Sequence, residues 1–359
     1  MRERRACGTL TAVSDDRSSA APILPTHTPP LFKEAVRRAT ALLRAGQVVA
    51  LPTETVYGLA ANALDEQAVA RIYECKGRPA RNPIIVHVDS LDMAKSCAKE
   101  WPATAERLAA AFWPGPLTLV VFRSAKIPAI VAAGGATVGL RWPSHPFMQA
   151  TIRACGFPLA APSANPSNQI SPTNAEHVRR LLGGRVPLII DGGQAQVGIE
   201  STVIDLTAES PRVLRPGMIH EASILAALQL PPYSIDGAAM GDGGGEPLKS
   251  PGCLVKHYSP SARLVVLAWE NDEDLRSQLD ARKLPANECH VVSHTRTPDL
   301  AGLSGVSVMP HDAEAFARAL YAEWHRCDET GVKIIVMETL PAGAEWNGLA
   351  DRLRRAAGP

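Results

Sequence analysis

Short apolar strand patterns and amphipathic helical patterns are interleaved along residues 31–220, and several strand patterns follow one another with no helix between them. Strict strand–helix alternation is typical of a parallel sheet, whereas directly connected strands favour antiparallel pairs. The chain is therefore expected to form an α/β domain with an open mixed sheet. A shorter alternation over residues 261–359 predicts a second, smaller α/β domain, for which we expect a parallel sheet.

The individual elements follow from apolar periodicity, cap residues and turn residues. In the first domain we expect strands at Gln47–Leu51, Ile84–Val88, Leu117–Phe122, Thr137–Arg141, Pro158–Ala161, Pro187–Asp191, Ser201–Leu206 and Arg212–Leu214. Its helices are expected at Phe32–Ala45, from the Asp65 cap to Lys76, across 90–112, near 145–155 and near 174–183. In the second domain we expect strands at Arg263–Ala268, Cys289–Ser293 and Lys333–Glu338, with helices at Ala313–Cys327 and Glu345–Arg355.

The segments outside the two domains have the composition of linkers. Residues 231–250 are dense in Gly and Pro and lack apolar periodicity, so we expect a linker within 221–260. Residues 1–30 are polar, small and Pro-rich, which predicts a disordered leader. A transit peptide is the weaker interpretation, because the leader contains Glu3, Asp15 and Asp16.

Charge and cysteine content exclude several classes of protein. The chain has 37 basic and 36 acidic residues, so no overall field attracts nucleic acid or an anionic membrane. No apolar run approaches the ~20 residues that span a bilayer, and we predict no membrane association. The seven cysteines include no C-x-x-C pair, which argues against a zinc site or a disulfide framework. Reduced thiols in the cytoplasm are expected.

The segment KGRPARNP at residues 76–83 concentrates positive charge in a rigid loop. Lys76, Arg78, Arg81 and the amide of Asn82 lie beside two prolines and a glycine, directly before the strand pattern IIVHV. Proline fixes φ and lacks an N–H, so these residues form neither a helix nor a strand interior. Fixed cations beside a strand suit a phosphate or a carboxylate. A solvated basic turn explains the same residues, and for Arg81 it is the better interpretation.

Polar side chains also occur at two other strand patterns. Thr53, Glu54 and Thr55 follow the first strand, at the kind of edge where α/β sheets bind ligands. A capped turn that opens a short helix explains them equally well. His87 interrupts an apolar strand, where a satisfied core histidine is the commoner case. Its closeness to the cationic loop favours a side chain that faces a ligand.

A third strand and its neighbours add further donors. Thr137, Gly139 and Arg141 share one strand face, and an arginine beside a glycine fits a pocket floor, although a polar edge strand is the alternative. The loop from Ser163 to Thr173 carries hydroxyls and amides that suit phosphate oxygens or only a turn. Arg215 supplies another cation at a strand end.

Common catalytic signatures are missing from the sequence. There is no Walker motif, no dinucleotide-binding glycine pattern between a strand and a helix, and no H-E-x-x-H or G-x-S-x-G. The remaining pattern is a set of separate cations, hydroxyls and a histidine without an evident covalent nucleophile. Such a set favours positioning and electrostatic stabilisation of an anionic transition state, as in nucleotidyl transfer.

Taken together, these motifs resemble the YrdC family. PTETVYGL, KGRPARNPIIVHV, WPGPLTLV, TVGLR, APSAN, GIESTVID and VLRPG occur in the family's order from about Leu31 onward. SPGCLVKHYSP, followed by a second α/β domain, resembles the family's long form. The resemblance implies a YrdC-like open twisted mixed sheet with a large basic cavity and a smaller Rossmann-like C-terminal domain.

The resemblance also implies a nucleotidyltransferase reaction. Its products are L-threonylcarbamoyl-AMP and pyrophosphate, and its substrates are L-threonine, bicarbonate and ATP, with Mg²⁺ accompanying ATP. A carbamate formed on the threonine amine attacks the α-phosphorus of ATP in line. A downstream threonylcarbamoyl-transferase complex then modifies a tRNA adenosine beside the anticodon, so tRNA is an indirect partner.

The family's site residues transfer to matching positions of this chain. The resemblance implies catalytic roles for Lys76, Arg78 and Arg141. It implies threonine contacts for Thr55, His87, Arg141, Ala161 and Ser201. It implies ATP contacts for Arg78, Asn82, Thr137, Ser163, Ser171, Arg215 and Tyr258, and it names no protein ligand for a metal.

Lys256, His257 and Tyr258 look like the segment that covers bound nucleotide in the family, and a Gly-rich hinge with a cationic aromatic tip suits a lid. A plain interdomain linker is the alternative. Cys253 and Leu254 depart from the family's usual Met and basic residue, which weakens the inference about the lid's contacts. Ala60 stands where Gly is common, at a position we expect to begin a helix.

Two other functions stay open at this stage. A double-stranded RNA-binding module could use the same basic concavity, although the balanced net charge argues against it. A carbamoyltransferase that handles carbamoyl-adenylate is the third hypothesis. The lack of C-x-x-C and the short C-terminal domain argue against that one.

Overall fold

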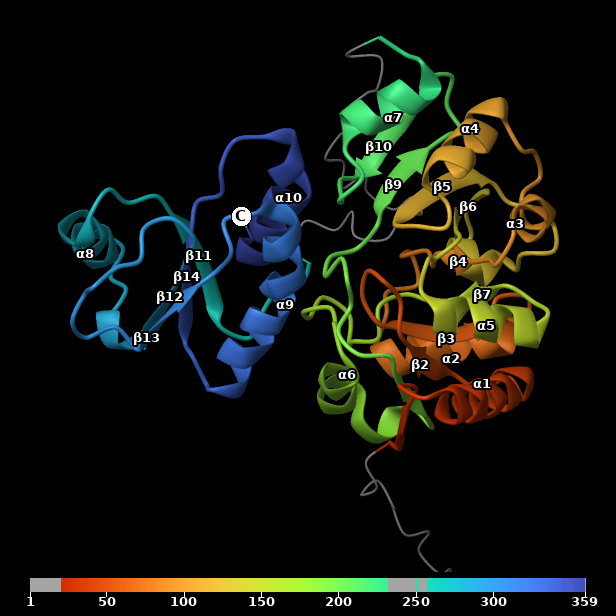
Figure 1. Cartoon of the computed structure of the whole chain (residues 1–359), viewed down its shortest axis with the longest axis horizontal. Coiled ribbons are helices and arrows are strands. Elements are labelled where there is room, and N and C mark those ends of the chain that lie inside the picture. Colours follow the sequence, from red (N-terminus) through yellow and green to blue (C-terminus); the bar gives the residue numbers. More distant parts are fainter. Residues whose placement is uncertain (1–20, 232–249, 251–256, 359) are drawn as a thin grey trace, which may run out of the picture.

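The computed structural model describes residues 21–231, 250 and 257–358, which contain two sheets with helices beside them (Figure 1). The larger sheet lies within residues 21–231 and the smaller one within 257–358. Helices α9 (Ala313–Glu329) and α10 (Asn347–Ala357) lie between the smaller sheet and the larger part of the molecule (Figure 1). These two helices therefore form the contact between the two parts.

The larger sheet is mixed, as the sequence predicts. Its ten strands in the described residues have the order β1-β8-β2-β3-β7-β4-β6-β5-β9-β10. Their bounds are β1 Ile23–Pro25, β2 Val49–Leu51, β3 Gly58–Asn62, β4 Val86–His87, β5 Leu117–Phe122, β6 Thr137–Arg141, β7 Leu159–Ala160, β8 Ile189–Asp191, β9 Thr202–Asp205 and β10 Arg212–Arg215. Pairs β1–β8, β4–β6 and β5–β9 are parallel, whereas β2–β3, β5–β6 and β9–β10 are antiparallel.

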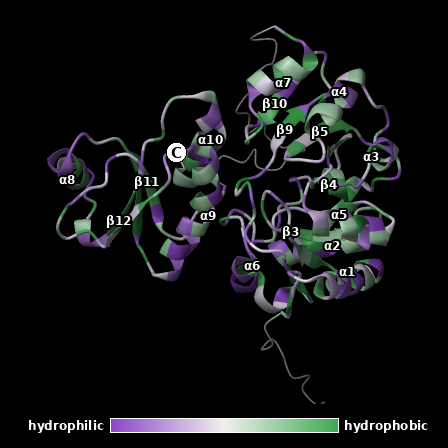
Figure 2. Cartoon of the chain, viewed as in Figure 1, coloured by the Kyte–Doolittle hydropathy of each residue, from purple (hydrophilic) through white to green (hydrophobic). Residues whose placement is uncertain are grey.

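Helices cover both faces of this sheet. Their bounds are α1 Pro29–Arg44, α2 Glu66–Lys76, α3 Leu91–Cys97, α4 Ala103–Phe112, α5 Pro146–Cys155, α6 Ala175–Leu182 and α7 Glu221–Leu228. Strand β2 shows the two-sided burial: Ala50 joins one hydrophobic cluster, while Val49 and Leu51 join the cluster beneath α1 and α5. Figure 2 shows hydrophobic residues along the strands of this sheet. Burial on both faces explains why these strands have near-continuous apolar sequences.

Helix α2 leads directly into the cationic loop, which precedes strand β4. Asp65 caps its first turn and accepts hydrogen bonds from the backbone N–H groups of Gln67 and Ala68, as the sequence predicts. Gly77 ends the helix in the left-handed conformation with φ of 58°, which glycine adopts without steric cost. Lys76 is the last helical residue and is buried. The loop therefore starts from a fixed point.

The smaller sheet is parallel throughout, which confirms the expectation from sequence. Its strand order is β11-β14-β12-β13, with bounds β11 Arg263–Leu267, β12 Cys289–Ser293, β13 Gly305–Val308 and β14 Ile334–Glu338. Helix α8 (Asp272–Ala281) lies on the side away from the larger part, opposite α9 and α10 (Figure 1). Among the described helices, none combines the length and apolarity that crossing a bilayer requires.

Three local expectations are wrong. Residues 21–30 are not disordered, because β1 pairs with β8 and α1 begins at Pro29; residues 1–20 lie outside the described residues. Part of the expected linker is helix α7, whose apolar residues Ile224, Leu225 and Leu228 join the main core. Ala60 lies inside strand β3 instead of at a helix start, since β3 pairs with β2. Lys256, Cys253 and Leu254 also lie outside the described residues.

Candidate functional site

A cavity opens where several strand ends of the larger sheet meet. It is lined by Thr53, Thr55, Val56, Gly58, Arg78, Ile85, His87, Arg141, Ala161, Pro162, Ser163, Glu200, Ser201, Arg215, His257 and Tyr258. Its free volume is about 50 Å³ with Tyr258, only 1% exposed, in place. Typical ligand pockets measure ~300–1,000 Å³. The conformation observed is thus one in which the His257–Tyr258 segment fills part of the site.

Arg141 is held at the end of β6 by one ion pair and two hydrogen bonds. Its Nη2 lies 2.7 Å from Glu54 Oε1, its Nη1 donates to Thr55 Oγ1 at 2.8 Å, and its Nε donates to the Gly115 carbonyl at 3.3 Å. Burial alone would raise the pKa of Glu54, but the Arg141 charge outweighs it and the pKa of Glu54 is lowered. The Glu54 carboxylate therefore stays ionised, and the guanidinium has a single defined orientation.

Two neutral histidines and a tyrosine hydroxyl contribute polar atoms to the cavity wall. His87 pairs with Arg141 across β4 and β6. Burial lowers the pKa of His87 and of His257 to about 3, so both rings are neutral at neutral pH. His87 Nδ1, His257 Nδ1 and the Tyr258 hydroxyl are buried and lack a hydrogen-bond partner among the described residues. Such atoms need a ligand or water to complete their hydrogen bonding.

In the segment from Lys76 to Asn82, one side chain lines the cavity and two others hold the loops around it. Arg78 lines the cavity, and its guanidinium donates to the Asn82 carbonyl at 2.9 Å and to Asn82 Oδ1 at 2.8 Å. Burial lowers the pKa of Arg78 to about 10, which leaves it charged at neutral pH. Lys76 Nζ instead donates to the carbonyls of Ser163 and Asn165, at 2.5 Å each. Lys76 thus holds the neighbouring loop and is not a lining residue.

Ser201 and Arg215 line the cavity together and bond to each other. Ser201 Oγ shares a hydrogen bond with Thr118 Oγ1 at 2.8 Å and accepts one from Arg215 Nη2 at 3.1 Å. Arg215 Nε also donates to the Ser201 carbonyl at 3.0 Å. The two side chains come from the start of β9 and the end of β10, which are antiparallel neighbours. The hydroxyl is therefore oriented before any substrate arrives.

The structure brings most predicted site residues to one cavity. Those that line it are Thr55, Arg78, His87, Arg141, Ala161, Ser163, Ser201, Arg215 and Tyr258. Lys76, Asn82, Thr137 and Ser171 are not among the lining residues. Lys76 and Asn82 support the loops, and Ser171 Oγ donates to Glu200 Oε1 at 2.5 Å. Thr137 begins β6, four residues before Arg141, and lies outside the cavity wall.

The residue-by-residue site assignments left out several lining residues, although Thr53 and His257 stood in segments expected to face a ligand. These are Thr53, Val56, Gly58, Ile85, Pro162, Glu200 and His257. The apolar ones carry no chemical signal, because they look like any core residue. Glu200 and His257 do carry a signal, because they lie inside the motifs GIEST and KHYSP on which the family resemblance rests.

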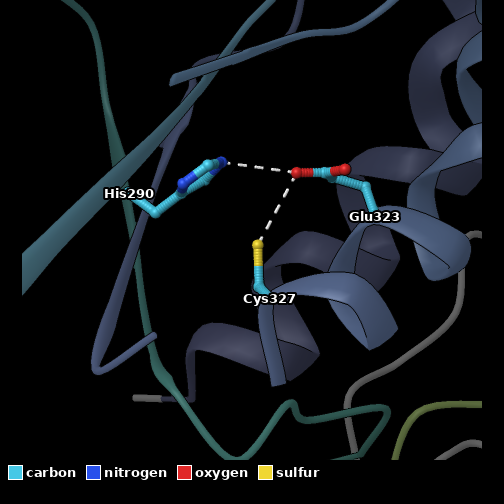
Figure 3. A group of neighbouring side chains, drawn as sticks. All are labelled: His290, Glu323 and Cys327. Atoms are coloured by element: carbon cyan, nitrogen blue, oxygen red, sulfur yellow. Dashed lines mark hydrogen bonds and ion pairs between the residues drawn. The ribbon is translucent and has the colours of Figure 1, made fainter. Parts of the chain in front are cut away.

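A separate group of potential metal ligands lies in the C-terminal part, where His290 on β12 faces Glu323 and Cys327 on α9 (Figure 3). Their ligand atoms lie within 4.8 Å of one another. However, Arg326 Nη2 lies 2.6 Å from Glu323 Oε1 and 2.9 Å from His290 Nε2, the position a metal ion would need. Burial raises the pKa of the Cys327 thiol to about 12, which disfavours the thiolate. We assign no metal to this cluster.

Comparison with known proteins identifies the family. Residues 41–217 match a family model described as "Telomere recombination", and residues 218–358 match one described as "Threonylcarbamoyl-AMP synthase, C-terminal domain". A threonylcarbamoyl-AMP synthase of Pyrococcus abyssi is 40% identical over 334 residues, covering 90% of this chain and 94% of the relative. The chain belongs to the Sua5/YciO/YrdC family.

Other members of the family agree over the same length. A Bacillus subtilis threonylcarbamoyl-AMP synthase is 37% identical over 329 residues, covering 90% of this chain and 93% of the relative. The crystal structure of Pyrococcus abyssi Sua5 complexed with L-threonine aligns with a TM-score of 0.84 at 37% identity, over 93% of this chain and 96% of that one. The predicted fold class and the predicted membership of the long form of the YrdC family are confirmed.

Proposed function

We propose that this chain is an L-threonylcarbamoyladenylate synthase, a nucleotidyltransferase that joins L-threonine, bicarbonate and ATP into L-threonylcarbamoyl-AMP and pyrophosphate. The observation that carries the proposal is a buried cavity whose lining includes Arg78, Arg141 and Arg215 together with two neutral histidines. Relatives that cover nine-tenths of the chain are named threonylcarbamoyl-AMP synthase. The carbamate, the triphosphate and the departing pyrophosphate of this reaction are all anionic, so clustered fixed cations suit it.

We assign the threonine to the wall formed by Thr55, His87, Arg141, Ala161 and Ser201. Arg141 supplies positive charge for the carboxylate, and its ion pair with Glu54 and two hydrogen bonds hold it in place. The neutral His87 ring can accept a hydrogen bond from the threonine amine or hydroxyl, because its Nδ1 has no partner among the described residues. A structure of Pyrococcus abyssi Sua5 complexed with L-threonine supports threonine as the amino acid.

We assign ATP to the side of the cavity lined by Arg78, Ser163, Arg215 and Tyr258. Arg78 and Arg215 both line the cavity, so together they can neutralise the charge of a phosphate chain bound there. In this conformation the predicted ATP residues Asn82, Thr137 and Ser171 do not line the cavity. Asn82 orients Arg78 and Ser171 orients Glu200, whereas Thr137 lies outside the lining.

The chemistry needs a nucleophile, a cation field and protection from water. The threonine amine takes up CO₂ from bicarbonate to form a carbamate, and a carbamate oxygen then attacks the α-phosphorus as the bond to pyrophosphate breaks. Arg78, Arg141 and Arg215 stabilise the negative charge that develops during this step. Burial raises the pKa of Tyr258, so its hydroxyl stays protonated and can donate to a phosphate oxygen. With His257 it shields the labile mixed anhydride from water.

Magnesium fits this site only as a companion of ATP. The two carboxylates closest to the cavity, Glu54 and Glu200, already pair with Arg141 and Arg352 at 2.7 and 2.8 Å. Mg²⁺ characteristically binds through substrate phosphates and water with few carboxylates. When it is present, it supplies further neutralisation of the phosphate oxygens, and every other role falls to the arginines.

We further propose a cytoplasmic enzyme that hands its product to a threonylcarbamoyl-transferase complex acting on tRNA. The cysteines Cys97, Cys155, Cys289 and Cys327 are free and buried, which suits a reducing compartment. A mixed anhydride hydrolyses readily in water, so its consumer must act soon after release. The double-stranded RNA-binding and carbamoyltransferase hypotheses lack comparable support, because the long relatives are named as synthases.

An omission series tests the proposed function. The purified full chain is incubated with MgATP, L-threonine and bicarbonate, and pyrophosphate release is followed. Release should require all three substrates, and L-serine should serve less well because it lacks the threonine methyl group. Pyrophosphate release that is independent of threonine contradicts the proposal.

A further inference from the structure

Glu200 lines the cavity, yet its carboxylate is bound mainly by the other part of the molecule. Its Oε1 accepts a hydrogen bond from Ser171 at 2.5 Å. Its Oε2 accepts one from the Tyr321 hydroxyl at 3.1 Å and one from Arg352 Nε at 2.8 Å. Tyr321 lies on α9 and Arg352 on α10, the two helices between the sheets. A side chain of the cavity wall is therefore held by the C-terminal domain.

Arg352 is the central residue of this contact. Its side chain is fully buried, and its Nη2 donates to the Glu200 carbonyl at 3.2 Å while its Nη1 donates to the Pro216 carbonyl at 2.8 Å. The Arg352 Cζ also lies 5.1 Å from the centre of the Tyr258 ring, within cation–π range. Arg352 thus contacts both a wall residue and the residue that fills the cavity.

The backbones on the two sides meet too closely for either to shift independently. Gly198 precedes Glu200 with φ of +85°, and a Cβ there would overlap the backbone of Ala317 on α9. A Cβ on Gly348 of α10 would lie 3.0 Å from the Gly217 carbonyl oxygen. Main chain therefore packs against main chain on both flanks of the Glu200–Arg352 pair. The wall segment has one docked position.

The wall that Arg352 holds contains a proposed substrate contact. Ser201 follows Glu200 directly, and its Oγ already bonds Thr118 and Arg215. A rotation of Glu200 would turn the Ser201 peptide and break that arrangement. A displacement of about 1 Å in a positioning group can reduce the rate about 100-fold.

We propose that Arg352 is a positioning residue of the synthase. It acts through Glu200 on Ser201 and through its ring contact on Tyr258, so that the cavity is complete only when α10 is docked. The inference rests on the proposed function and on the proposed threonine wall. It gives the C-terminal domain a role in the reaction beyond anchoring the linker.

A simple docking salt bridge is the competing explanation, and a double variant separates the two. Either single change, Arg352→Met or Glu200→Gln, leaves a buried group without its partner, so loss of stability is expected under both explanations. In the Glu200→Gln/Arg352→Met chain neither charge of this pair remains, and the second acidic partner of Arg352, Asp351, keeps its pairs with Arg354 and Arg355. The unfolding temperature should therefore recover toward wild type. If Arg352 positions the wall, kcat/KM for threonine should stay at least about tenfold reduced.

The assay uses the full chain and measures kcat, KM for threonine, KM for ATP and the unfolding midpoint for each variant. Arg352→Lys keeps the charge but not the fork, and it should recover part of the activity lost in Arg352→Met. Arg276→Met is the matched control, because Arg276 is an exposed arginine of the same domain on α8, on the side of the sheet away from α9 and α10 (Figure 1). Its kinetic constants should equal those of wild type.

Tyr321→Phe tests the proposal even if the arginine variants do not fold. It removes only the hydroxyl that donates to Glu200, so we expect a rise in threonine KM of about threefold or more without a matching fall in the unfolding midpoint. A double variant that recovers both stability and kcat/KM, or a Tyr321→Phe chain with wild-type threonine KM, overturns the proposal. Failure of the proposed function would look different, since the wild-type chain itself would form no product.

Discussion

Removing Arg141 should reverse the pH dependence of stability that Glu54 imposes. The two side chains are 5% and 7% exposed and lie 2.7 Å apart. In the wild-type chain the pKa of Glu54 is lowered, since burial raises it but Arg141 outweighs burial. Stability from this carboxylate is therefore present above its unfolded pKa of about 4.3 and is lost as the pH falls through the lower folded pKa.

In Arg141→Ala both contributions of Arg141 are lost, and burial, the largest influence, is opposed only by backbone hydrogen bonds, so we expect the folded pKa of Glu54 to rise above the unfolded value. The variant is then most stable below about pH 4.3 and loses stability as the pH rises toward the new folded pKa, by about 1.4 kcal/mol for each pH unit that separates the unfolded from the folded pKa. At neutral pH the total loss should be about 3–5 kcal/mol, as for other buried pairs with one partner removed.

Urea unfolding followed by circular dichroism at about pH 5 and about pH 7.5 measures both effects. Arg123→Ala is the matched control, because Arg123 donates to the carbonyls of Gly135 and Ile127 and its loss should be independent of pH. Adding Glu54→Gln to Arg141→Ala should abolish the pH dependence. A loss below about 1 kcal/mol at neutral pH, or a variant that gains stability as the pH rises, would refute the reasoning.

Three further changes test other parts of the site. Arg78→Ala should reduce kcat/KM about 100-fold or more in a chain that still folds, with a lower urea midpoint because Asn82 loses its donor. A fully active variant would exclude Arg78 from the ATP pocket. Lys76→Met leaves the carbonyls of Ser163 and Asn165 without their donor, so urea unfolding should show a loss of about 1–3 kcal/mol. His87 has a folded pKa of about 3, below its unfolded value, so the stability that its neutral ring contributes is lost as the pH falls below about 6.5. His87→Gln should therefore make acid unfolding less steep. An unchanged acid-unfolding profile counts against the neutral ring.

Much of the fold was predictable because its strands and helices carry strong local signals. Leu117–Phe122 and Cys289–Ser293 are β-branched apolar runs, and both strands have the predicted bounds. Strand β3 was missed because GLAAN is built from residues with low β propensity, and pairing with β2 and β7 creates the strand. Helix α8 was missed because only Leu275 and Leu279 are buried on an otherwise polar helix.

For the site, too, local sequence predicts some residues, whereas contacts between distant residues determine others. A position facing the cavity could be predicted for Arg78 from the neighbouring prolines and for Arg141 from the alternating strand. Whether a motif cation faces the cavity was not predictable, since Lys76 and Arg78 are two residues apart and only Arg78 lines it. The contact of Glu200 with Arg352, 152 residues later, depends on how two domains dock. Sequence spacing carries no information on that docking.

Product identification tests the central claim most directly. The wild-type chain is incubated with MgATP, L-threonine and isotopically labelled bicarbonate, and the products are separated and identified by mass spectrometry. The account predicts threonylcarbamoyl-AMP that carries the bicarbonate label, formed in equal amount with pyrophosphate. No such product from bicarbonate and threonine, with a carbamoyl-adenylate formed from carbamoyl phosphate instead, would contradict it.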